Sequence, residues 1–380
     1  MEQWRGSVEG LEMNWNGKSV LLTGHTGFKG SWLSLWLQQL GADLCGIALP
    51  PPPGANLFQD AEIARGMRSV MGDVRDLRLL KQTFLEHRPE IVFHLAAQPI
   101  VRLSYENPLD TYSTNVMGTV SVLEAARHSE TVRAIVVVTS DKCYENREWA
   151  WPYRETDRLG GYDPYSSSKA CVELVVSAYR DSFFNPTEFS RHGVAIASVR
   201  AGNVIGGGDW SEDRLVPDII RAFMEERPVR IRHPKAIRPW QHVLEPLRGY
   251  LAVAESLREA GSVNGEGWNF GPDQSDAQPV EWMVRELARF WGAGARWTLD
   301  EDQQPHEAQN LKLDCSKAEA RLRWRPALRL QDALAMTAAW YRARMHGQDM
   351  NVFTRDQIGS YAERCQADTE LQTESSGVQA

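Results

Sequence analysis

An acid and an amine stand side by side where one predicted strand ends. In the segment VVVTSDKCYEN (136–146), three valines lead directly into a hydroxyl pair and then Asp141 and Lys142. A strand that opens to solvent needs only a turn residue there, and one acid would serve that purpose. A carboxyl group next to an amine could instead supply a proton donor and a proton acceptor to one reaction. The pairing therefore indicates acid–base chemistry at this strand end.

A tyrosine and a lysine follow further along the chain at helical spacing. In YDPYSSSKACVE (162–173), Tyr165 and Lys169 are four residues apart, which places them on one face of a helix. A free tyrosine has a pKa of about 10, and a neighbouring cation, helped by an oxidised nicotinamide, would stabilise the phenolate as a base. A surface pair is the alternative on spacing alone, but the position after TSDK favours catalysis.

A glycine-rich turn near the start of the chain predicts a dinucleotide site. Strand-like residues 18–24 lead into TGHTGFKG, which has the spacing G-x-x-G-x-x-G. Such glycines allow the backbone to approach a pyrophosphate closely, and the helix predicted from Phe28 offers its N-terminal amides. A glycine turn without a ligand is the alternative, but the strand before it and the helix after it are the required context. The predicted cofactor contacts in this loop are Gly24, Thr26, Gly27, Phe28, Lys29 and Gly30.

The end of the second predicted strand carries no side chain that separates NAD from NADP. Residues 48–50 read Ala-Leu-Pro, whereas an NAD site usually has an acid there to bind the ribose hydroxyls. There is no arginine for a 2′-phosphate either, although Lys29 leaves NADP open. Our hypothesis is NAD held with modest affinity, because one ribose contact is missing. Asp73 and Val74 are predicted to lie at the adenine edge, and Asp73 could equally cap a helix.

The elements that must position these residues alternate along the first 200 residues. Short β-branched runs are separated by segments with helical spacing, a pattern typical of a parallel sheet with helices on both faces. The predicted fold class is α/β, a Rossmann-type doubly wound parallel sheet with a smaller mixed α/β substrate-binding lobe. The predicted division is an extension 1–16, a NAD-binding domain 17–202 with returning segments at roughly 230–260 and 308–330, a range 203–350 that is mainly the nucleotide-sugar-binding lobe, and a disordered tail over 364–380. Helices in the lobe are predicted at 214–226, 245–260, 279–291 and 330–346.

Composition and charge argue against several other classes of protein. The net charge of −8 and the pI near 5.7 disfavour a nucleic-acid-binding surface. No apolar run approaches the roughly 20 residues that span a bilayer, and the polar N-terminus does not predict a signal peptide. The five cysteines are odd in number and lack the spacing of metal ligands, so we expect reduced thiols in a cytoplasmic protein without a metal site.

Four motifs, taken in order, give the chain a family resemblance. TGHTGFKG, LAAQPIV, TSDKCY and YSSSK resemble the extended short-chain dehydrogenase/reductase superfamily, in particular its nucleotide-sugar epimerases and dehydratases. The similarity covers roughly residues 14–350 and includes VRLSYENPLDTYSTNVMGT, RAGNVIGGGDW, RPWQHVLEPL and PHEAQNLKLDCSKA. Lysine after TSD resembles the branch that acts on CDP-glucose. The resemblance implies NAD as cofactor, with further contacts from Leu95, Ala96, Ala97, Tyr165 and Lys169.

The resemblance also implies a reaction. Dehydratases of this family oxidise the sugar at C4, eliminate water across C5 and C6, and return the hydride to C6. Tyr165 would take the C4 hydroxyl proton, Ser140 would hydrogen-bond that hydroxyl, and Lys169 would also bind the nicotinamide ribose. Asp141 would protonate the departing C6 oxygen, which requires a raised pKa. Lys142 would remove the C5 proton, which requires a pKa well below its usual value of about 10.4. In the alternative, Lys142 partners Asp141 or binds a phosphate, and another group is the C5 base.

The matching motifs imply a set of substrate contacts. The asparagine and both arginines of the set are expected at the diphosphate, where a guanidinium can bind in bidentate geometry. A structural role is the equal alternative for each histidine, and the glutamate would hold a ribose or order its loop. Outside this set, Cys143 is predicted to pack rather than to act as a nucleophile, and Thr139 to satisfy backbone groups. The predicted substrate-binding residues are Asn203, Arg214, Arg238, His242, His306 and Glu307.

Members of the family usually dimerise through two long helices on each subunit. Segments 107–128 and 164–185 would supply them, so a homodimer or a dimer of dimers is expected, although packing within one subunit gives a similar pattern. A C4 epimerase or a dehydratase for another nucleotide is the alternative enzyme, and the TSDK strand end argues against the epimerase. A catalytically silent NAD-binding regulator is the alternative from a different class. The presence of both Tyr165 and Lys169 argues against it.

Overall fold

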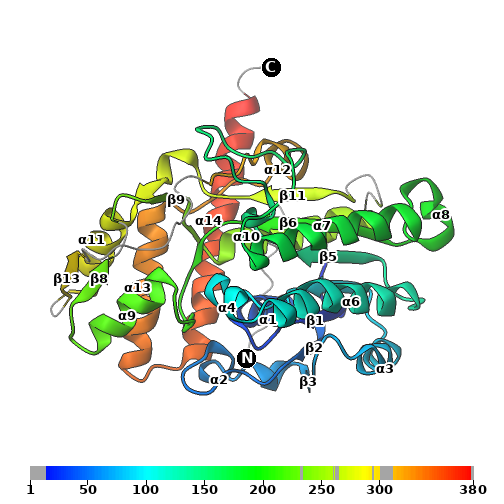
Figure 1. Cartoon of the computed structure of the whole chain (residues 1–380), viewed down its shortest axis with the longest axis horizontal. Helices are drawn as coiled ribbons and strands as arrows, with labels where there is room; N and C mark the ends of the chain where they lie inside the picture. The colour runs from blue at the N-terminus through cyan, green and yellow to red at the C-terminus, as the bar shows by residue number, and fades with distance from the viewer. Residues whose placement is uncertain are drawn as a thin grey trace.

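A seven-stranded parallel sheet forms the centre of the molecule (Figure 1). The computed structural model describes residues 14–231, 234–259, 261, 265–292, 295–299 and 311–377. The strand order is β11-β6-β5-β4-β1-β2-β3, and all neighbouring strands are parallel. This confirms the predicted doubly wound sheet. The strands are β1 Ser19–Thr23, β2 Asp43–Ala48, β3 Arg68–Met71, β4 Ile91–His94, β5 Ala134–Val138, β6 Ala195–Ala201 and β11 Gly267–Phe270.

Helices cover both faces of this sheet. Helices α1 and α10 pack on one face around a large hydrophobic cluster, and α14 packs against α1. Helices α3, α6 and α7 enclose a second cluster on the other face. Every residue of β4, β5 and β6 is buried, because both sides of these strands lie under helices. The bounds are α1 Phe28–Gln39, α3 Leu77–His87, α6 Gly118–Arg127, α7 Pro164–Ser182, α10 Leu244–Glu259 and α14 Met350–Gly377.

Shorter elements connect these layers. Most of them lie in the crossovers between strands, and one, η2, is a π-helical turn between α5 and α6. Another, η3, follows β5 directly and contains the acid–amine pair. The short elements are α2 Leu57–Asp60, η1 Ile63–Gly66, α4 Val101–Glu106, α5 Pro108–Tyr112, η2 Ser113–Met117, η3 Asp141–Cys143, η4 Pro186–Glu188 and α8 Phe189–His192.

A smaller lobe built from segments that follow β6 in the chain lies beside the sheet, with α9, α11 and α13 gathered on one side of the molecule (Figure 1). The four helices predicted there correspond to α9, α10, α11 and α13. Two-stranded pairings hold the lobe together, namely β7 with β10, β8 with β13, and β9 with β12. The remaining bounds are β7 Val204–Ile205, α9 Leu215–Met224, β8 Val229–Ile231, β9 Ile237–Arg238, β10 Gln241–His242, η6 Gln274–Asp276, β12 Gln278–Pro279, α11 Val280–Trp291, β13 Trp297–Leu299, α12 Ser316–Leu322 and α13 Leu330–Met345.

Two parts of the structure differ from the predicted organisation. Residues 267–270 fall in the range predicted to be mainly the smaller lobe, but they form β11, which pairs with β6 at the edge of the main sheet. The polar segment from 364 predicted a disordered tail, whereas α14 continues through this segment to Gly377. Ile358, Tyr361 and Cys365 are buried, so an apolar stripe at helical spacing docks the helix as far as Cys365.

The sheet changes direction between β1 and β4, which lie side by side although β2 and β3 follow β1 in the chain. Ligands of such sheets bind at this switch point, beyond the carboxyl ends of the strands. Gly24 closes β1 with φ +77°, and a Cβ there would lie 2.8 Å from the backbone nitrogen of Ala96. The hydroxyl of Thr23 accepts hydrogen bonds from the backbone amides of Leu95 and Ala96, at 3.2 Å each. Glycine is therefore required where the two strand ends meet.

None of the helices in the described part of the chain is long and apolar enough to cross a membrane. All five cysteines are free, as the sequence predicts. No group of three or more potential metal ligands occurs among the described residues.

Candidate functional site

The glycine turn leaves the start of α1 open to an anion. Gly27 is the N-cap, and neither a side-chain cap nor an acid in the first turn competes for the helix amides. A Cβ on Gly30 would lie 2.0 Å from the carbonyl oxygen of Gly24, so this glycine allows the turn to close. A Cβ on Gly27 would approach only that same carbonyl, at 3.4 Å. The backbone therefore fits a pyrophosphate at the helix N-terminus, as the motif predicts.

The polar side chains of the residues predicted near the adenosine half of the cofactor already have hydrogen-bond partners in the protein. The hydroxyl of Thr26 donates to the carbonyl oxygen of Leu49 at 2.9 Å and so ties the glycine turn to the end of β2. The carboxylate of Asp73 accepts hydrogen bonds from the backbone and guanidinium of Arg75. Asp73 is not the cap of α3, because Asp76 fills that position. Val74 is buried in the second core cluster.

Lys29 lies among the catalytic candidates rather than on the adenosine side. Burial, together with the positive charges of Arg214 and Lys169, lowers the pKa of Lys29 to about 7. The negative charges of Asp141 and Asp209 oppose this shift. These neighbours place the amine on the substrate side of the glycine turn. A role for Lys29 in binding an NADP 2′-phosphate is not supported by this position.

The acid predicted at the end of β5 is buried and hydrogen-bonded. Ser140 caps η3, accepting from the backbone amide of Lys142 at 3.2 Å and donating to Oδ1 of Asp141 at 2.8 Å. Burial raises the pKa of Asp141, against the opposing charge of Lys142 and the hydrogen bond from Ser140. The direction agrees with the sequence prediction, since a proton donor must retain its proton until the reaction. Lys142 itself is half-buried.

Asp141 lies close to the carboxyl end of β6 and to the smaller lobe. A Cβ on Gly202 would lie 3.1 Å from Oδ2 of Asp141. The charges of Lys29 and Arg238 also act on this carboxyl group. Asn203, which follows Gly202, accepts a hydrogen bond at its carbonyl from the amide of Gln241. The acid therefore stands where the sheet and the lobe meet, which is where a substrate would lie.

Tyr165 and Lys169 lie in the first turns of α7, both nearly buried. Burial raises the pKa of Tyr165 to about 12, and a hydrogen bond with Ser140 is the largest opposing effect. In the protein without cofactor, burial therefore outweighs the cations near the phenol, one of which is Arg214. The role of Lys169 in stabilising the phenolate beside an oxidised nicotinamide stays a prediction. Lys169 donates from Nζ to the carbonyl oxygen of Val138 at 3.2 Å, and burial lowers its pKa to about 8.

The structure separates the five predicted substrate residues other than Asn203 into three groups. Arg214 starts α9, forms a 3.0 Å ion pair with Asp209 and lies near Tyr165, and Arg238 lies near Asp141. His242 is fully buried, packed edge-on against the ring of Trp32 with the ring centroids 5.7 Å apart. Burial also lowers the pKa of His242 to about 3. A structural role for His242 is therefore favoured over a substrate contact. The predicted residues outside the described part of the chain are His306 and Glu307.

Cys143 and Thr139 flank the acid–amine pair. Cys143 has no exposed surface and packs in a cluster with Tyr144 and Tyr153, which confirms its predicted packing role. Burial also raises the pKa of its thiol well above the usual range. Thr139 donates to the carbonyl oxygen of Val199, as predicted, and also to the carboxylate of Glu173.

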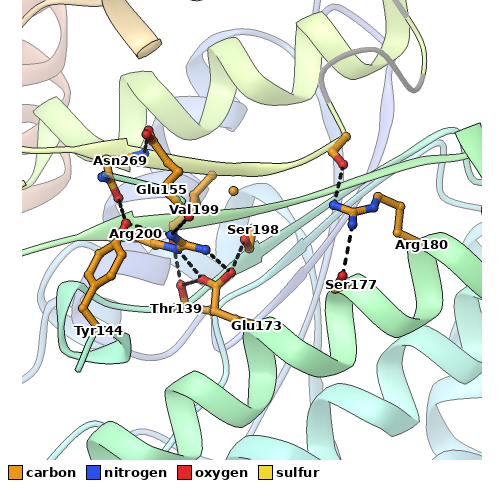
Figure 2. A network of polar contacts seen from close by, with 12 residues as sticks. Thr139, Tyr144, Glu155, Glu173, Ser177, Arg180, Ser198, Val199, Arg200 and Asn269 are labelled. Carbon is orange, nitrogen blue, oxygen red and sulfur yellow. Dashed lines mark hydrogen bonds and ion pairs between the residues drawn. The ribbon is translucent and has the colours of Figure 1, made fainter. Parts of the chain in front are cut away.

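A buried ion pair beneath the site was not predicted from the sequence. Glu173 of α7 and Arg200 of β6 form it, and hydrogen bonds join it to Thr139, Tyr144 and Ser198 (Figure 2). The signal available in the sequence was spacing, because Glu173 follows Lys169 by one helical turn. Its partner, Arg200, is 27 residues further along the chain, and no local sequence pattern predicts such a contact.

Comparison with known proteins identifies the family of the chain. A family model for GDP-mannose 4,6 dehydratase matches residues 21–337. A CDP-glucose 4,6-dehydratase of Salmonella typhimurium is 54% identical over 347 residues, covering 91% of this chain and 97% of that protein. A dTDP-glucose 4,6-dehydratase of Streptomyces griseus is 31% identical, covering 85% and 93%. The solved structure of MoeE5 with UDP-glucose and NAD is 25% identical and superposes with a TM-score of 0.71, covering 86% and 99%. The chain belongs to the GDP-mannose 4,6 dehydratase family of nucleotide-sugar dehydratases, within the extended short-chain dehydrogenase/reductase superfamily.

Proposed function

We propose that the protein is a CDP-glucose 4,6-dehydratase that uses NAD and forms CDP-4-keto-6-deoxyglucose. The observation that carries the proposal is the buried acid Asp141, whose raised pKa suits a proton donor, beside Tyr165 and a dinucleotide turn. A C4 epimerase needs no acid at this position. The Salmonella relative supports CDP-glucose over other nucleotide sugars, because it is 54% identical over nearly the whole chain. The product would serve the synthesis of deoxysugars for surface polysaccharides such as O-antigen.

NAD, when bound, would accept a hydride from C4 of the sugar and return it to C6. The open amides of α1 would hold its pyrophosphate, and Leu95–Ala97 at the switch point would contact it. The MoeE5 structure, which contains NAD, supports this choice. We expect modest affinity, because β2 ends without an acid and Asp73 already binds Arg75. Full occupancy after purification and extensive dialysis would contradict that expectation.

Tyr165 would act as the base for oxidation at C4. With a pKa of about 12, the phenol holds its proton at neutral pH until nearby positive charge stabilises the phenolate. Arg214 supplies part of this charge, and the oxidised cofactor would add more. Ser140 hydrogen-bonds the phenol and is placed to share the C4 hydroxyl with it. Lys169, one helical turn away, would bind the nicotinamide ribose.

The elimination step needs an acid at C6 and a base at C5. Asp141 would donate the proton to the departing C6 oxygen, and Lys142, the next residue, would remove the C5 proton. Lys29 is a second amine in the site, with a pKa of about 7. Phosphates bound at the start of α1 would raise that pKa and keep the amine charged. We therefore assign the C5 base to Lys142.

Replacing Lys142 with methionine should stop exchange of the C5 proton with solvent. Methionine keeps an unbranched chain of similar length but cannot accept a proton, and general-base groups contribute about 10²–10⁴-fold to such steps. Exchange into the product or the bound sugar can be followed by NMR in deuterated water. Lys29→Met is the matched variant at the second amine, and there the rate of exchange should keep pace with the C4 oxidation that the variant retains. Exchange that persists in Lys142→Met and disappears in Lys29→Met would move the base to Lys29.

Substrate preference tests the proposed function directly. The full-length protein with added NAD should form a 4-keto sugar from CDP-glucose, with kcat/KM at least about tenfold above that for dTDP-glucose or UDP-glucose, the size expected when one buried hydrogen bond to the base is lost. Faster turnover of another nucleotide sugar would identify a different dehydratase. Absence of turnover with all three would favour a silent NAD-binding regulator.

We further propose that the protein is a homodimer that works in the cytoplasm. The packed elements α5, η2 and α7 expose large apolar side chains that an isolated subunit would leave in water, namely Leu109 at 84%, Met117 at 54% and Leu174 at 61% exposure. These elements lie within the segments predicted to dimerise. The five free cysteines suit a reducing compartment. A mass near 86 kDa by light scattering, twice the chain mass of 42.9 kDa, is expected.

A further inference from the structure

The geometry points to Glu173 as a positioning residue for the dehydratase reaction, one that fixes the segment carrying Ser140, Asp141 and Lys142 and places a carboxylate one helical turn from Lys169. This inference rests on the proposed function. Glu173 is itself too deeply buried to meet the substrate, with 5% of its surface exposed. It would act on the reaction through the residues that it holds.

Each oxygen of the Glu173 carboxylate accepts two hydrogen bonds. Oε1 accepts from Nε of Arg200 at 2.9 Å and from the hydroxyl of Thr139. Oε2 accepts from a terminal nitrogen of Arg200 at 2.8 Å and from the hydroxyl of Ser198 at 2.6 Å. The fork of the guanidinium therefore meets the carboxylate in bidentate geometry (Figure 2). Although burial opposes ionisation, Arg200 and these hydroxyls hold the pKa of Glu173 below its usual value.

The ion pair is hydrogen-bonded to the residues on both sides of the catalytic segment, residues 140–143. Thr139, bound to Glu173, directly precedes Ser140. Tyr144, at the other end, directly follows Cys143, and its hydroxyl accepts a hydrogen bond from Arg200 at 2.7 Å. The same hydroxyl donates to Oδ1 of Asn269 in β11 at 2.8 Å. The residues between these two anchors carry the acid and the proposed C5 base, so their position depends on the pair.

Glu173 also acts on Lys169 through charge. The two residues are one turn apart on α7, both buried. Glu173 is the largest effect that raises the pKa of Lys169, with a smaller one from Cys143 on η3. Burial works in the opposite direction. Lys29 on α1 and His94 on β4 also face Lys169, and its charge lowers the pKa of each. Without the carboxylate, Lys169 would lose its proton at a lower pH.

Stability alone does not account for this pair. A buried ion pair is often no more stabilising than apolar side chains of similar volume, because removing two charges from water is costly. The hydroxyl groups of Thr139, Tyr144 and Ser198 all hydrogen-bond to the pair, so the pair organises its neighbours as well as filling space. The pair lies where the catalytic helix, the catalytic strand end and β6 meet (Figure 2). From this position the ion pair can hold the catalytic residues of the helix and of the strand end in fixed relative positions.

Glu173→Gln in the full-length holoenzyme tests the inference, because glutamine keeps the shape and removes the charge. We expect kcat to fall at least about tenfold with KM changed less than about twofold, since substrate contacts remain while the reacting groups shift. The alkaline limb of the pH profile of kcat should move to lower pH, because the carboxylate that raises the pKa of Lys169 is removed. Glu173→Asp, which keeps the charge, should restore the limb in part. Ser198→Ala removes one hydrogen bond to the same carboxylate without removing charge, and should leave the limb unchanged.

Two further measurements keep the outcome decisive. Lysine-selective NMR of the holoenzyme reports the pKa of Lys169 without turnover, so a fall in Glu173→Gln supports the inference even if CDP-glucose is not the substrate. Glu173→Met with Arg200→Met removes both charges and secures a folded protein if the single variant unfolds. This double variant should also show the lowered Lys169 pKa. A wild-type Lys169 pKa and a wild-type pH profile in either variant would overturn the inference and leave the pair a purely structural role.

Discussion

Replacing Tyr165 with phenylalanine should lower kcat by about 10²–10⁴-fold, the contribution typical of a general base. Phenylalanine fills the same buried space but cannot take the C4 hydroxyl proton, so oxidation itself fails. The cofactor should therefore remain oxidised when substrate is added, and exchange at C5 should also cease, because no ketone forms to acidify that proton. Stopped-flow absorbance of the cofactor and NMR of the sugar measure both effects.

The matched control lies on the same helix. Tyr179 is a half-buried tyrosine of α7 whose ring lies 5.1 Å from that of Phe183, well along the helix from the catalytic turn. Tyr179→Phe should keep wild-type kcat within about twofold, as a substitution outside the reacting groups does. A Tyr165→Phe enzyme that still reduced its cofactor at near wild-type rate would remove Tyr165 from the role of base.

Replacing Asp141 with asparagine should separate oxidation from elimination. The amide keeps the shape and can still accept the hydrogen bond from Ser140, but it cannot protonate the departing C6 oxygen. We expect product formation to fall about 10²–10⁴-fold while C4 oxidation and C5 exchange continue. Reduced cofactor should then accumulate on the enzyme, which absorbance would show directly.

The stability of the same variant is a second readout. Because burial raises the pKa of Asp141, the charged carboxylate contributes little to the stability of the folded protein. The Asp141→Asn variant should therefore unfold at nearly the same temperature as the wild-type protein. Asp209→Asn is the control, because Asp209 forms a 3.0 Å ion pair with Arg214. This variant should unfold at a lower temperature than the wild-type protein, since it leaves the charge of Arg214 without its partner. Normal elimination by Asp141→Asn would show that another group is the acid.

The parts of the fold that could be predicted are those determined by residues close together in the sequence. The apolar strands and the spacing of Gly24, Gly27 and Gly30 predict the sheet and the helix that starts at Phe28. The strand β11 could not be found this way. Its sequence, GWNF, is short and contains glycine and asparagine, and only pairing with β6 makes it a strand. Docking of α14 is similarly a tertiary effect, because an otherwise polar helix buries one narrow stripe.

The site shows the same division. The residue types and spacings of Asp141, Tyr165 and Lys169 identify the catalytic groups, but their pKa values depend on burial, which the sequence does not state. Burial raises the pKa of Tyr165 although a lysine lies one turn away. Arg200 joins Glu173 from another strand, so the pair appears only once α7 is laid against β6.

CDP-glucose that carries deuterium at C4 provides the most direct test of the central claim. The protein should be incubated with this substrate and NAD, and the product examined by NMR and mass spectrometry. We predict a 4-keto sugar whose new C6 methyl group carries the deuterium, with the C5 hydrogen drawn from solvent. This pattern requires oxidation, elimination and return of the same hydride in one site. A C4 epimer, or a product whose deuterium is lost to water, would contradict the account.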